Sequence, residues 1–294
     1  MYQPRQFPVS ESEFEKLFPN ESACIDYLFH TRWPNGFHCP SCMSNDDDVE
    51  PDRIITCAHC GEQTSLTTGT IMDGTDMPLH DWLLALWWLS MQDGGTLDIP
   101  GKLHLGSYHT ARGWLHQLRV VMALADEDPC RGVVEIGSKY AAPAVSIMRP
   151  VQVLAAAERL FPSGNIGRIH MQVIESLKAE HVKSFVHQFL EEGCTIVGPK
   201  LSAYADAANY GSVYVLDGGG DCPVGIHEIM SKFEVWLKNM HRGGIEIHSL
   251  QQYCDEFCFQ HNALIQADSQ TVFSSLLEGC FAGLSKPAPE FAGT

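Results

Sequence analysis

The sequence predicts an α+β protein of several parts: a small cysteine-rich ribbon with flanking helices, a helical segment, and a mixed α/β domain. Three observations lead to this fold class. Two Cys-x-x-Cys pairs lie near the N-terminus, helical spacing of apolar residues follows them, and apolar strands alternate with helices after residue 130. The 294 residues suffice for about two domains, and a hydrophobic content of 45% allows a real core.

The two Cys-x-x-Cys pairs, Cys39 with Cys42 and Cys57 with Cys60, predict a structural zinc site. Each pair holds two thiolates close enough to bind one tetrahedral ion, and two pairs complete a four-sulfur shell. A disulfide framework would need an oxidising compartment, and the N-terminus has no basic start followed by an apolar run. A redox Cys-x-x-Cys normally comes singly. We therefore expect a zinc ribbon.

The residues around the cysteines predict the frame of this ribbon. Helical spacing indicates two short helices, from Glu11 to Phe18 and from Glu21 to Phe29. The turn sequence Pro34-Asn35-Gly36 then leads into the first cysteine pair. His38 and His59 lie beside the cysteines and could ligate a metal, but four sulfurs already fill a closed zinc shell.

The next segment predicts a helix-turn-helix. Pro78 opens a helix through Met91, a short helix begins near Asp98 as its cap, and a Gly106-Ser107 turn precedes a helix from Tyr108 to about Ala125. On the last helix an apolar face runs along one side. A second face could contact DNA, or it could be an ordinary solvated surface; it carries His109, Arg112, His116 and Arg119.

The acidic charge limits how this protein could bind nucleic acid. The chain carries 36 Asp and Glu against 19 Lys and Arg, a formal net charge of −17, and no segment is basic. Because phosphate binding depends on lysine and arginine displacing counterions, DNA binding by the whole surface is disfavoured and only a local patch remains. No segment is long and apolar enough for a membrane span, so we expect a soluble, intracellular, cytoplasmic protein with no membrane partner.

At these residues the chain resembles the Merlin/ISXO-like insertion-sequence transposases. The resemblance is strongest over residues 14 to 90. It implies a zinc ribbon and a helix-turn-helix that recognise DNA, and an RNase H-like domain whose Asp-Asp-Glu metal triad cuts and joins it. The stretches that carry it are Leu17-Phe18-Pro19-Asn20-Glu21-Ser22-Ala23-Cys24, Arg32-Trp33-Pro34-Asn35-Gly36-Phe37-His38-Cys39-Pro40-Ser41-Cys42, Cys57-Ala58-His59-Cys60-Gly61-Glu62-Gln63-Thr64-Ser65 and Pro78-Leu79-His80-Asp81-Trp82.

The periodicity of the second half predicts an RNase H-like domain, a mixed sheet with helices packed on it. Its expected elements are the strands Val133–Ile136, Val151–Ala157, Ile166–Val173, Cys194–Val197 and Ser212–Leu216, and the helices Val182–Leu190, Gly225–Met240 and His248–Leu264. The predicted domains are therefore a helical lead-in over 1–33, the zinc ribbon over 34–70, the helix-turn-helix over 71–126, the RNase H-like domain over 131–265 and a C-terminal tail over 266–294.

The resemblance places the three acids of the family at Gly137, Gly198 and Ser231, and none of these is an acid. We therefore expect the metal triad to be lost. Strand alternation puts Lys139 on the face of Gly137, and Lys200 follows Gly198 closely. We hypothesise that one or both lysines place an ammonium where a divalent ion would sit.

A displaced carboxylate cluster is the alternative to loss. Its candidate members are Glu135, Asp217, Glu228 and Glu234, and in an acidic protein these could equally be solvated surface acids.

The resulting prediction is a transposase-derived, catalytically inactive zinc-ribbon protein that acts by binding DNA or a protein. Two alternatives stay open: an active transposase with relocated carboxylates, which alone would need magnesium or manganese, and an acidic adaptor that binds no DNA. The resemblance also implies self-association. We further expect zinc removal to unfold the N-terminal third and to leave the RNase H-like part standing.

Overall fold

A computed structural model gives the structure of the chain. It describes residues 7–46, 51–91, 96–104, 108–140, 151–199, 211–215, 222–240, 249–265 and 268–282. The chain forms two compact units, which are described separately: the first contains residues up to Gly113 together with a helix after Asp268, and the second begins at Trp114. No helix in these ranges combines the length and apolar composition that crossing a bilayer would require.

Three helices frame the first unit, and they form where helical spacing predicts them: α1 (Glu11–Leu17), α2 (Glu21–Arg32) and α3 (Leu79–Ser90). The Asn20 side chain caps α2 by accepting from the Ala23 N–H at 3.0 Å. Glu21 then caps α3 from outside, because its carboxylate accepts the first two N–H groups of α3, those of Leu79 and His80, at 3.1 and 3.3 Å. This contact fixes α3 to the start of α2.

A helix from the far end of the chain completes this unit. Helix α9 (Ser269–Phe281) packs on α3, and its apolar side is buried at Val272, Phe273, Leu276, Leu277 and Cys280. The Ile71 N–H donates to the Cys280 carbonyl at 3.0 Å. The sequence analysis treated 266–294 as a tail, because a single apolar stripe does not reveal which surface it covers. Residues 269–281 are instead part of the core of the N-terminal unit.

After α3 the chain forms η1 (Thr96–Asp98), α4 (Ile99–Lys102) and α5 (Tyr108–Ala125). The order of a helix, a short helix and a longer helix is the predicted one, and Asp98 is the residue that precedes α4. The predicted Gly106-Ser107 turn lies outside the described residues, so the helix-turn-helix stays a prediction.

The second unit is built on a five-stranded mixed sheet of order β7-β6-β5-β8-β9. Strands β5 (Val133–Tyr140), β6 (Gln152–Leu160) and β7 (Asn165–Ile174) are antiparallel, whereas β8 (Thr195–Gly198) and β9 (Ser212–Val215) run parallel to β5. Each strand overlaps the segment predicted for it. The sheet order and directions confirm the expected mixed α+β fold, consistent with an RNase H-like domain.

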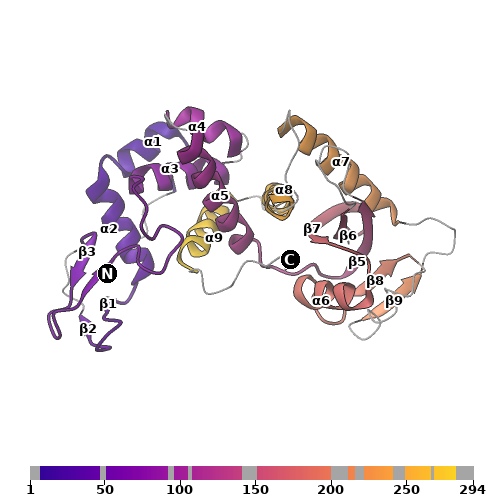
Figure 1. Ribbon diagram of the computed structural model, residues 1–294, viewed down its shortest axis with the longest axis horizontal. Helices are drawn as coiled ribbons and strands as arrows, with labels where there is room; N and C mark the ends of the chain where they lie inside the picture. Colours follow the sequence, from indigo (N-terminus) through magenta and orange to yellow (C-terminus); the bar gives the residue numbers. More distant parts are fainter. Residues whose placement is uncertain are drawn as a thin grey trace. The chain divides into compact units, whose positions relative to one another are not determined.

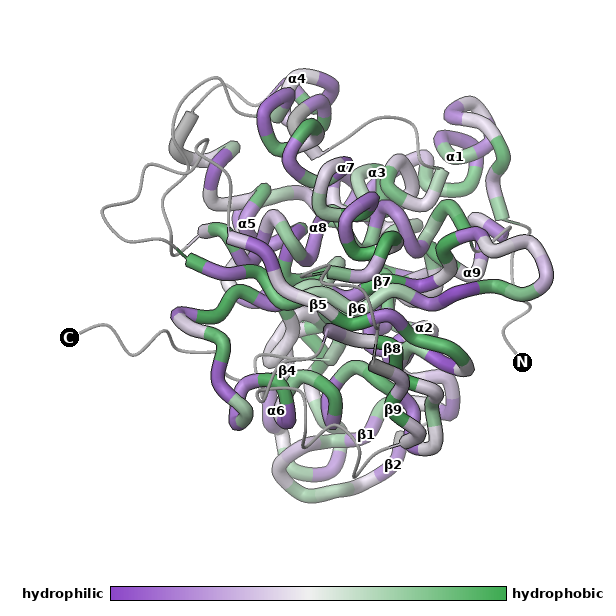
Figure 2. Tube along the Cα trace, turned by 90° about the vertical axis from the view of Figure 1, so that its right-hand side faces the viewer, coloured by the Kyte–Doolittle hydropathy of each residue, from purple (hydrophilic) through white to green (hydrophobic). Residues whose placement is uncertain are grey.

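Helices cover both faces of this sheet. Helix α6 (Ala179–Phe189) lies on one side, and α7 (Val224–Met240) and α8 (Leu250–Ile265) lie on the other (Figure 1). Each face has its own hydrophobic core, one shared with α6 and one shared with α7 and α8. Strand β6 carries the unbroken apolar run Val153–Ala157, whereas hydrophilic and hydrophobic residues are mixed along α6 (Figure 2). This is the pattern of a sheet that is buried on both faces.

Helix α8 is tied to the edge strand β7 by side-chain hydrogen bonds as well as by apolar packing. The Asn262 side chain pairs with both backbone groups of Ile169, at 2.9 Å each, and its amide also donates to Asp126. At the second residue of α8, the Gln251 oxygen accepts from the Val173 N–H at 2.7 Å. These side chains satisfy backbone groups of an edge strand that would otherwise be left exposed.

Asp255, on the same helix, is expected to make the stability of the second unit depend on pH. Burial raises the pKa of its carboxyl to about 7, and the nearby negative Asp126 adds to the rise. The folded state therefore holds this proton more tightly than the unfolded chain does, so stability falls as the pH rises from about 4 through 7. Asp255→Asn keeps an acceptor for Gln251, and we expect it to stabilise the unit by about 1–2 kcal/mol at pH 8.

Urea unfolding of both proteins at pH 5 and pH 8 measures this effect. The difference between them isolates Asp255, since His170, whose pKa is lowered by burial, titrates in both. Glu192→Gln, an exposed acid of the same unit, is the matched control. An equal response of Asp255→Asn and wild type to pH would contradict the prediction.

Candidate metal centre and nuclease-site positions

Two matching knuckles carry the four cysteines of the ribbon. Cys39 and Cys42 lie between the strands β1 (Phe37–His38) and β2 (Asn45–Asp46), whereas Cys57 and Cys60 lie between β3 (Ile54–Thr56) and β4 (Gln63–Ser65). In each knuckle the first cysteine carbonyl accepts the N–H of the residue after the second cysteine, at 3.0 and 2.9 Å.

The residue after each second cysteine adopts a left-handed backbone conformation. In the second knuckle it is Gly61, with φ of 75°, which suits glycine. In the first knuckle it is Met43, with φ of 59° and a side chain that is 79% exposed. The two turns therefore share one backbone path, although only one of them has the residue that this path favours.

The four sulfurs converge on one point. The Cys39 and Cys60 sulfurs are 3.6 Å apart, those of Cys42 and Cys57 are 3.7 Å apart, and all four lie within 4.8 Å of one another. A tetrahedral zinc ion with bonds of about 2.3 Å requires sulfur separations of about 3.8 Å. The residues therefore fit zinc, as the sequence predicted.

Ser44 favours the thiolate form of two of the cysteines. Its hydroxyl lies 3.1 Å from the Cys42 sulfur and 3.3 Å from the Cys57 sulfur. Hydrogen bonding by Ser44 lowers the pKa of Cys42 and lowers the pKa of Cys57 to about 6. Thiolates are the form that binds zinc. The neighbouring His38 and His59 are exposed and do not belong to the group of converging ligand atoms.

The structure separates the four residues of the predicted DNA-contacting face. Arg112 and His116 are exposed on α5, and the side chain of His109 lies outside the described part. Arg119 points inward. Its Nε donates to Glu256 at 2.7 Å, and its guanidinium lies 4.4 Å from the centre of the Tyr253 ring. Arg119 is 6% exposed and Glu256 0%, so this arginine holds α5 to α8 and does not face solvent.

The first position of the expected acid triad is closed by packing. Gly137 lies in the middle of β5, facing the start of α7. A Cβ added at Gly137 would lie 2.8 Å from the Cys222 sulfur, 3.2 Å from Pro223 and 3.3 Å from Ile226. A side chain at this position would require the Cys222 sulfur to shift and Pro223 and Ile226 to give by a few tenths of an ångström.

The second position points to the other side of the sheet. In the parallel register Glu135 pairs with Val197, so Gly198 comes beside Ile136. A Cβ added at Gly198 would lie 3.2 Å from the Ile136 side chain, which belongs to the core on the α6 side. Gly137 and Gly198 therefore do not share a face. By alternation Pro199, which is no acid either, follows on the face of Gly137.

The third position and its neighbours are occupied by local interactions. The Ser231 hydroxyl donates to the His227 carbonyl within α7 at 2.8 Å. Glu228 pairs with Lys232 at 2.8 Å, which lowers the pKa of Glu228. Glu234 lies 3.4 Å from the ammonium of Lys139. The structure thus places one of the two predicted lysines beside a carboxylate, and Lys200 lies outside the described residues.

Glu135 is the buried acid of this face, and it already has partners. Its Oε1 accepts from Arg159 at 2.7 Å, and its Oε2 accepts the Gly225 N–H at 2.6 Å, at the start of α7. Sequence reasoning missed Arg159, because nothing in the spacing of β6 shows that its side chain crosses to β5. A signal was present at Gly225, where a Cβ would come within 2.6 Å of Glu135.

Among the described residues, no group of three or more carboxylates lies close enough together to hold a metal ion. The four cysteines are the group in these ranges whose ligand atoms gather closely enough to hold a metal. Asp217, the fourth candidate of the displaced cluster, lies outside them.

Comparison with known proteins finds two family matches. Residues 19–63 match the family described as a transposase zinc-ribbon domain, and residues 146–262 match the one described as an ISXO2-like transposase domain. The second match does not include position 137. A curated relative, described as an uncharacterized protein in transposable element ISH50 of Halobacterium salinarum, is 28% identical over 76 residues.

That alignment covers 24% of this chain and 26% of the relative, so the chain spans about a quarter of the relative's length. No solved structure matches the chain. The two family matches confirm the resemblance on which the sequence analysis relied.

Proposed function

Because the chain carries a transposase zinc ribbon and an ISXO2-like transposase domain, we propose that it descends from a transposase. In this proposal it acts by binding DNA or a protein and does not cut DNA. One observation carries this proposal. The strand that would present the first catalytic acid presents Gly137, against which the start of α7 packs directly. Phosphodiester cleavage by this kind of site needs carboxylates that hold two divalent ions close together, and among the described residues no group of three or more carboxylates gathers in this way.

The charges around Gly137 support the same proposal. Lys139 and Arg159 neutralise Glu234 and Glu135. A cation beside each acid opposes the binding of a second cation. The acids then serve the fold: Glu135 accepts an N–H group at the start of α7 and holds Arg159 across the sheet.

A nicking assay tests the loss of activity. Zinc-loaded protein is incubated with manganese and supercoiled DNA that carries candidate terminal repeats. We expect no metal-dependent nicks above the protein-free reaction. Nicks that disappear in Glu135→Ala would establish the alternative, an active transposase with relocated ligands. Glu135→Ala also removes hydrogen bonds that hold the fold. Glu228→Gln is therefore assayed beside it, because it removes another candidate acid of the displaced cluster at a half-exposed position.

A small basic patch on α5 supports the proposed binding of DNA. Arg112 and His116 are exposed on this helix, and Arg119 is not available to DNA. We expect weak DNA binding through few phosphate contacts, with log K falling by about 0.9 per contact as log salt rises. Mobility shifts over a salt series measure this slope, and Arg112→Gln should reduce it by about 1.

A second candidate function is an adaptor that binds a protein and no DNA. The net charge of −17 and the inward position of Arg119 favour it. Its signature in the same experiment is the absence of a shift at the lowest salt concentration, where phosphate contacts are strongest.

A further inference from the structure

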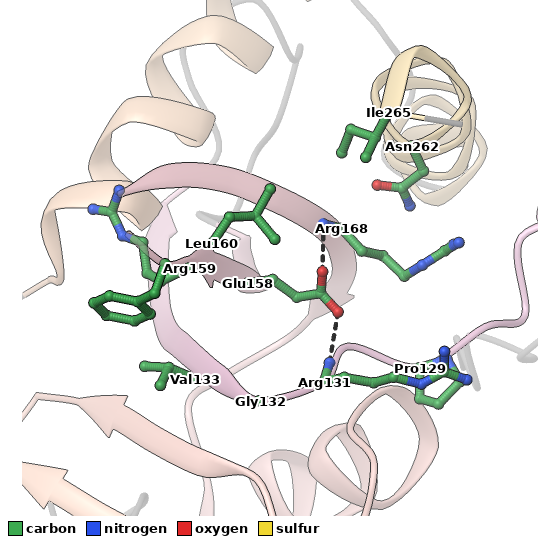
Figure 3. A pocket seen from close by; sticks show the side chains of 11 residues that line it. Pro129, Arg131, Gly132, Val133, Glu158, Arg159, Leu160, Arg168, Asn262 and Ile265 are labelled. Carbon is green, nitrogen blue, oxygen red and sulfur yellow. Dashed lines mark hydrogen bonds between the residues drawn. The ribbon is translucent and has the colours of Figure 1, made fainter. Parts of the chain in front are cut away.

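A pocket of about 510 Å³ opens in the second unit where β5 begins (Figure 3). Its volume lies in the range of sites for small organic ligands. The zinc cysteines, Gly137, Gly198 and Ser231 do not line it, although Arg159, the partner of Glu135, does. Its wall comes from the approach to β5, the ends of β6 and β7 that meet there, and the last turn of α8.

Three arginines line this pocket, and each of them also pairs with a carboxylate beside it. Arg131, Arg159 and Arg168 line it, against one acid, Glu158. That acid is committed to the backbone: one oxygen accepts the Arg131 N–H at 2.6 Å, and the other accepts the Arg168 N–H at 3.0 Å. Glu158 therefore fixes the two arginine-bearing segments relative to each other, and Gly167, where a Cβ would approach Glu158 to 2.6 Å, leaves it room.

The side chains of Arg131 and Arg168 extend to the same side of Glu158 (Figure 3). Arg168 is held in place by the buried Asp126 and by Asp128. Arg131 is 60% exposed and pairs with an equally accessible Glu191 at 3.3 Å. Exposed ion pairs contribute little, so Arg131 can exchange this carboxylate for a ligand anion.

The remaining wall is apolar and accessible. Leu160, Phe161 and Ile265 line the pocket with exposed fractions of 41%, 74% and 43%. Large apolar side chains gathered around a pocket mark a binding surface. An exposed phenylalanine ring in a pocket that arginines also line is a typical platform on which a nucleic-acid base stacks.

We propose that this pocket binds a nucleotide, with its phosphate held by Arg131 and Arg168 and its base against Phe161. The apolar wall distinguishes this ligand from inorganic phosphate, and the arginines distinguish it from an uncharged aromatic molecule. The shared chemistry, a phosphate monoester next to a base, occurs in a free mononucleotide and at the 5′-phosphorylated end of a DNA strand. The site does not depend on the proposed loss of nuclease activity.

Calorimetric titration of the full-length, zinc-loaded protein tests the proposal. The probes are adenosine monophosphate, adenosine, inorganic phosphate, and a short oligonucleotide with or without a 5′-phosphate. We expect the monophosphate to bind at least about 10-fold more tightly than adenosine, because a charge-assisted hydrogen bond is lost with the phosphate. If the 5′-phosphorylated oligonucleotide binds more tightly than the monophosphate, the ligand is a DNA end. If it binds equally or more weakly than the monophosphate, the ligand is a free nucleotide.

Two variants and two matched controls locate the site. Arg131→Gln should weaken the monophosphate about 10-fold or more, and Phe161→Ala should weaken it about 5-fold or more while leaving inorganic phosphate unchanged. Both side chains are mostly exposed, so both variants should fold. Lys183→Gln on α6 and Tyr214→Ala on β9 remove an exposed cation and an exposed aromatic ring elsewhere, and they should change nothing.

Three results would overturn the proposal. The first is no binding of the monophosphate at 10 mM, a concentration about tenfold above a Kd of about 1 mM. The second is equal binding of inorganic phosphate and the monophosphate. The third is monophosphate binding that both Arg131→Gln and Phe161→Ala leave unchanged.

Discussion

Replacing Leu276 of α9 by aspartate is expected to unfold the N-terminal unit and to release its zinc. Leu276 is 0% exposed, and truncating such a side chain to alanine alone costs about 2–5 kcal/mol. Burying an unpaired carboxylate in its place costs more. This loss is comparable to the whole stability of a typical domain, about 5–15 kcal/mol.

The effect should reach the zinc site because contacts connect α9 to the ribbon. Phe273 of α9 contacts the ring of Tyr27 on α2, at 6.4 Å between centroids. At the end of α2 the Arg32 guanidinium donates to the carbonyls of Leu66 and, at 2.7 Å, Thr68, directly after β4. Loss of α9 therefore removes support from the helix that holds the second knuckle.

Zinc release to a chromogenic chelator, followed together with urea unfolding, measures this effect. The matched control is Ser274→Asp, which adds the same charge on the exposed side of α9. Zinc retention and an unchanged unfolding transition in Leu276→Asp would show that the ribbon folds without α9. The structure also refines the expectation for zinc removal, because the region that should unfold includes residues 269–281 as well as the N-terminal third.

Arg119→Gln is expected to destabilise the second unit by about 3–5 kcal/mol. The substitution leaves the Glu256 carboxylate, which is 0% exposed, without the Arg119 charge 2.7 Å away. Removing one member of a buried ion pair costs this much, because the carboxylate that stays behind loses the opposite charge that offset its desolvation. The contact of the guanidinium with the Tyr253 ring is lost as well.

Arg112→Gln on the same helix separates a structural role from a DNA-binding role. Arg112 is exposed, so its substitution should leave urea stability within about 0.5 kcal/mol of wild type and weaken DNA binding. Arg119→Gln with normal stability and lost DNA binding would mean that Arg119 contacts DNA after all. The double variant Arg119→Met/Glu256→Met should recover much of the stability, since it removes both buried charges together.

Much of the fold was predictable from local patterns. The helices α2, α3 and α5 and the strands β5 to β9 overlap their predicted ranges, because apolar spacing reports directly which face of an element is buried. The zinc site was predictable for a similar reason. A Cys-x-x-Cys turn is a local structure, and two of them close together in the sequence leave little freedom in how the sulfurs meet.

The direction of a single side chain was less predictable. His109, Arg112, His116 and Arg119 are equivalent by spacing, yet Arg119 is buried because a partner, Glu256, lies on a helix more than a hundred residues later. Gly137 and Gly198 both lie in strands, in β5 and β8. Their faces depend on the register between β5 and β8, and a shift of one residue reverses every side chain.

The sequence alone therefore determined the α+β class, the zinc ligands, the family resemblance and the absence of acids at Gly137, Gly198 and Ser231. The tertiary structure decided which groups meet: Glu135 with Arg159, Lys139 with Glu234, and α9 with α3. The physical reason is range. Patterning and turn chemistry act between residues that are close in the chain, whereas strand register, buried ion pairs and the surface that a terminal helix covers depend on contacts between distant segments.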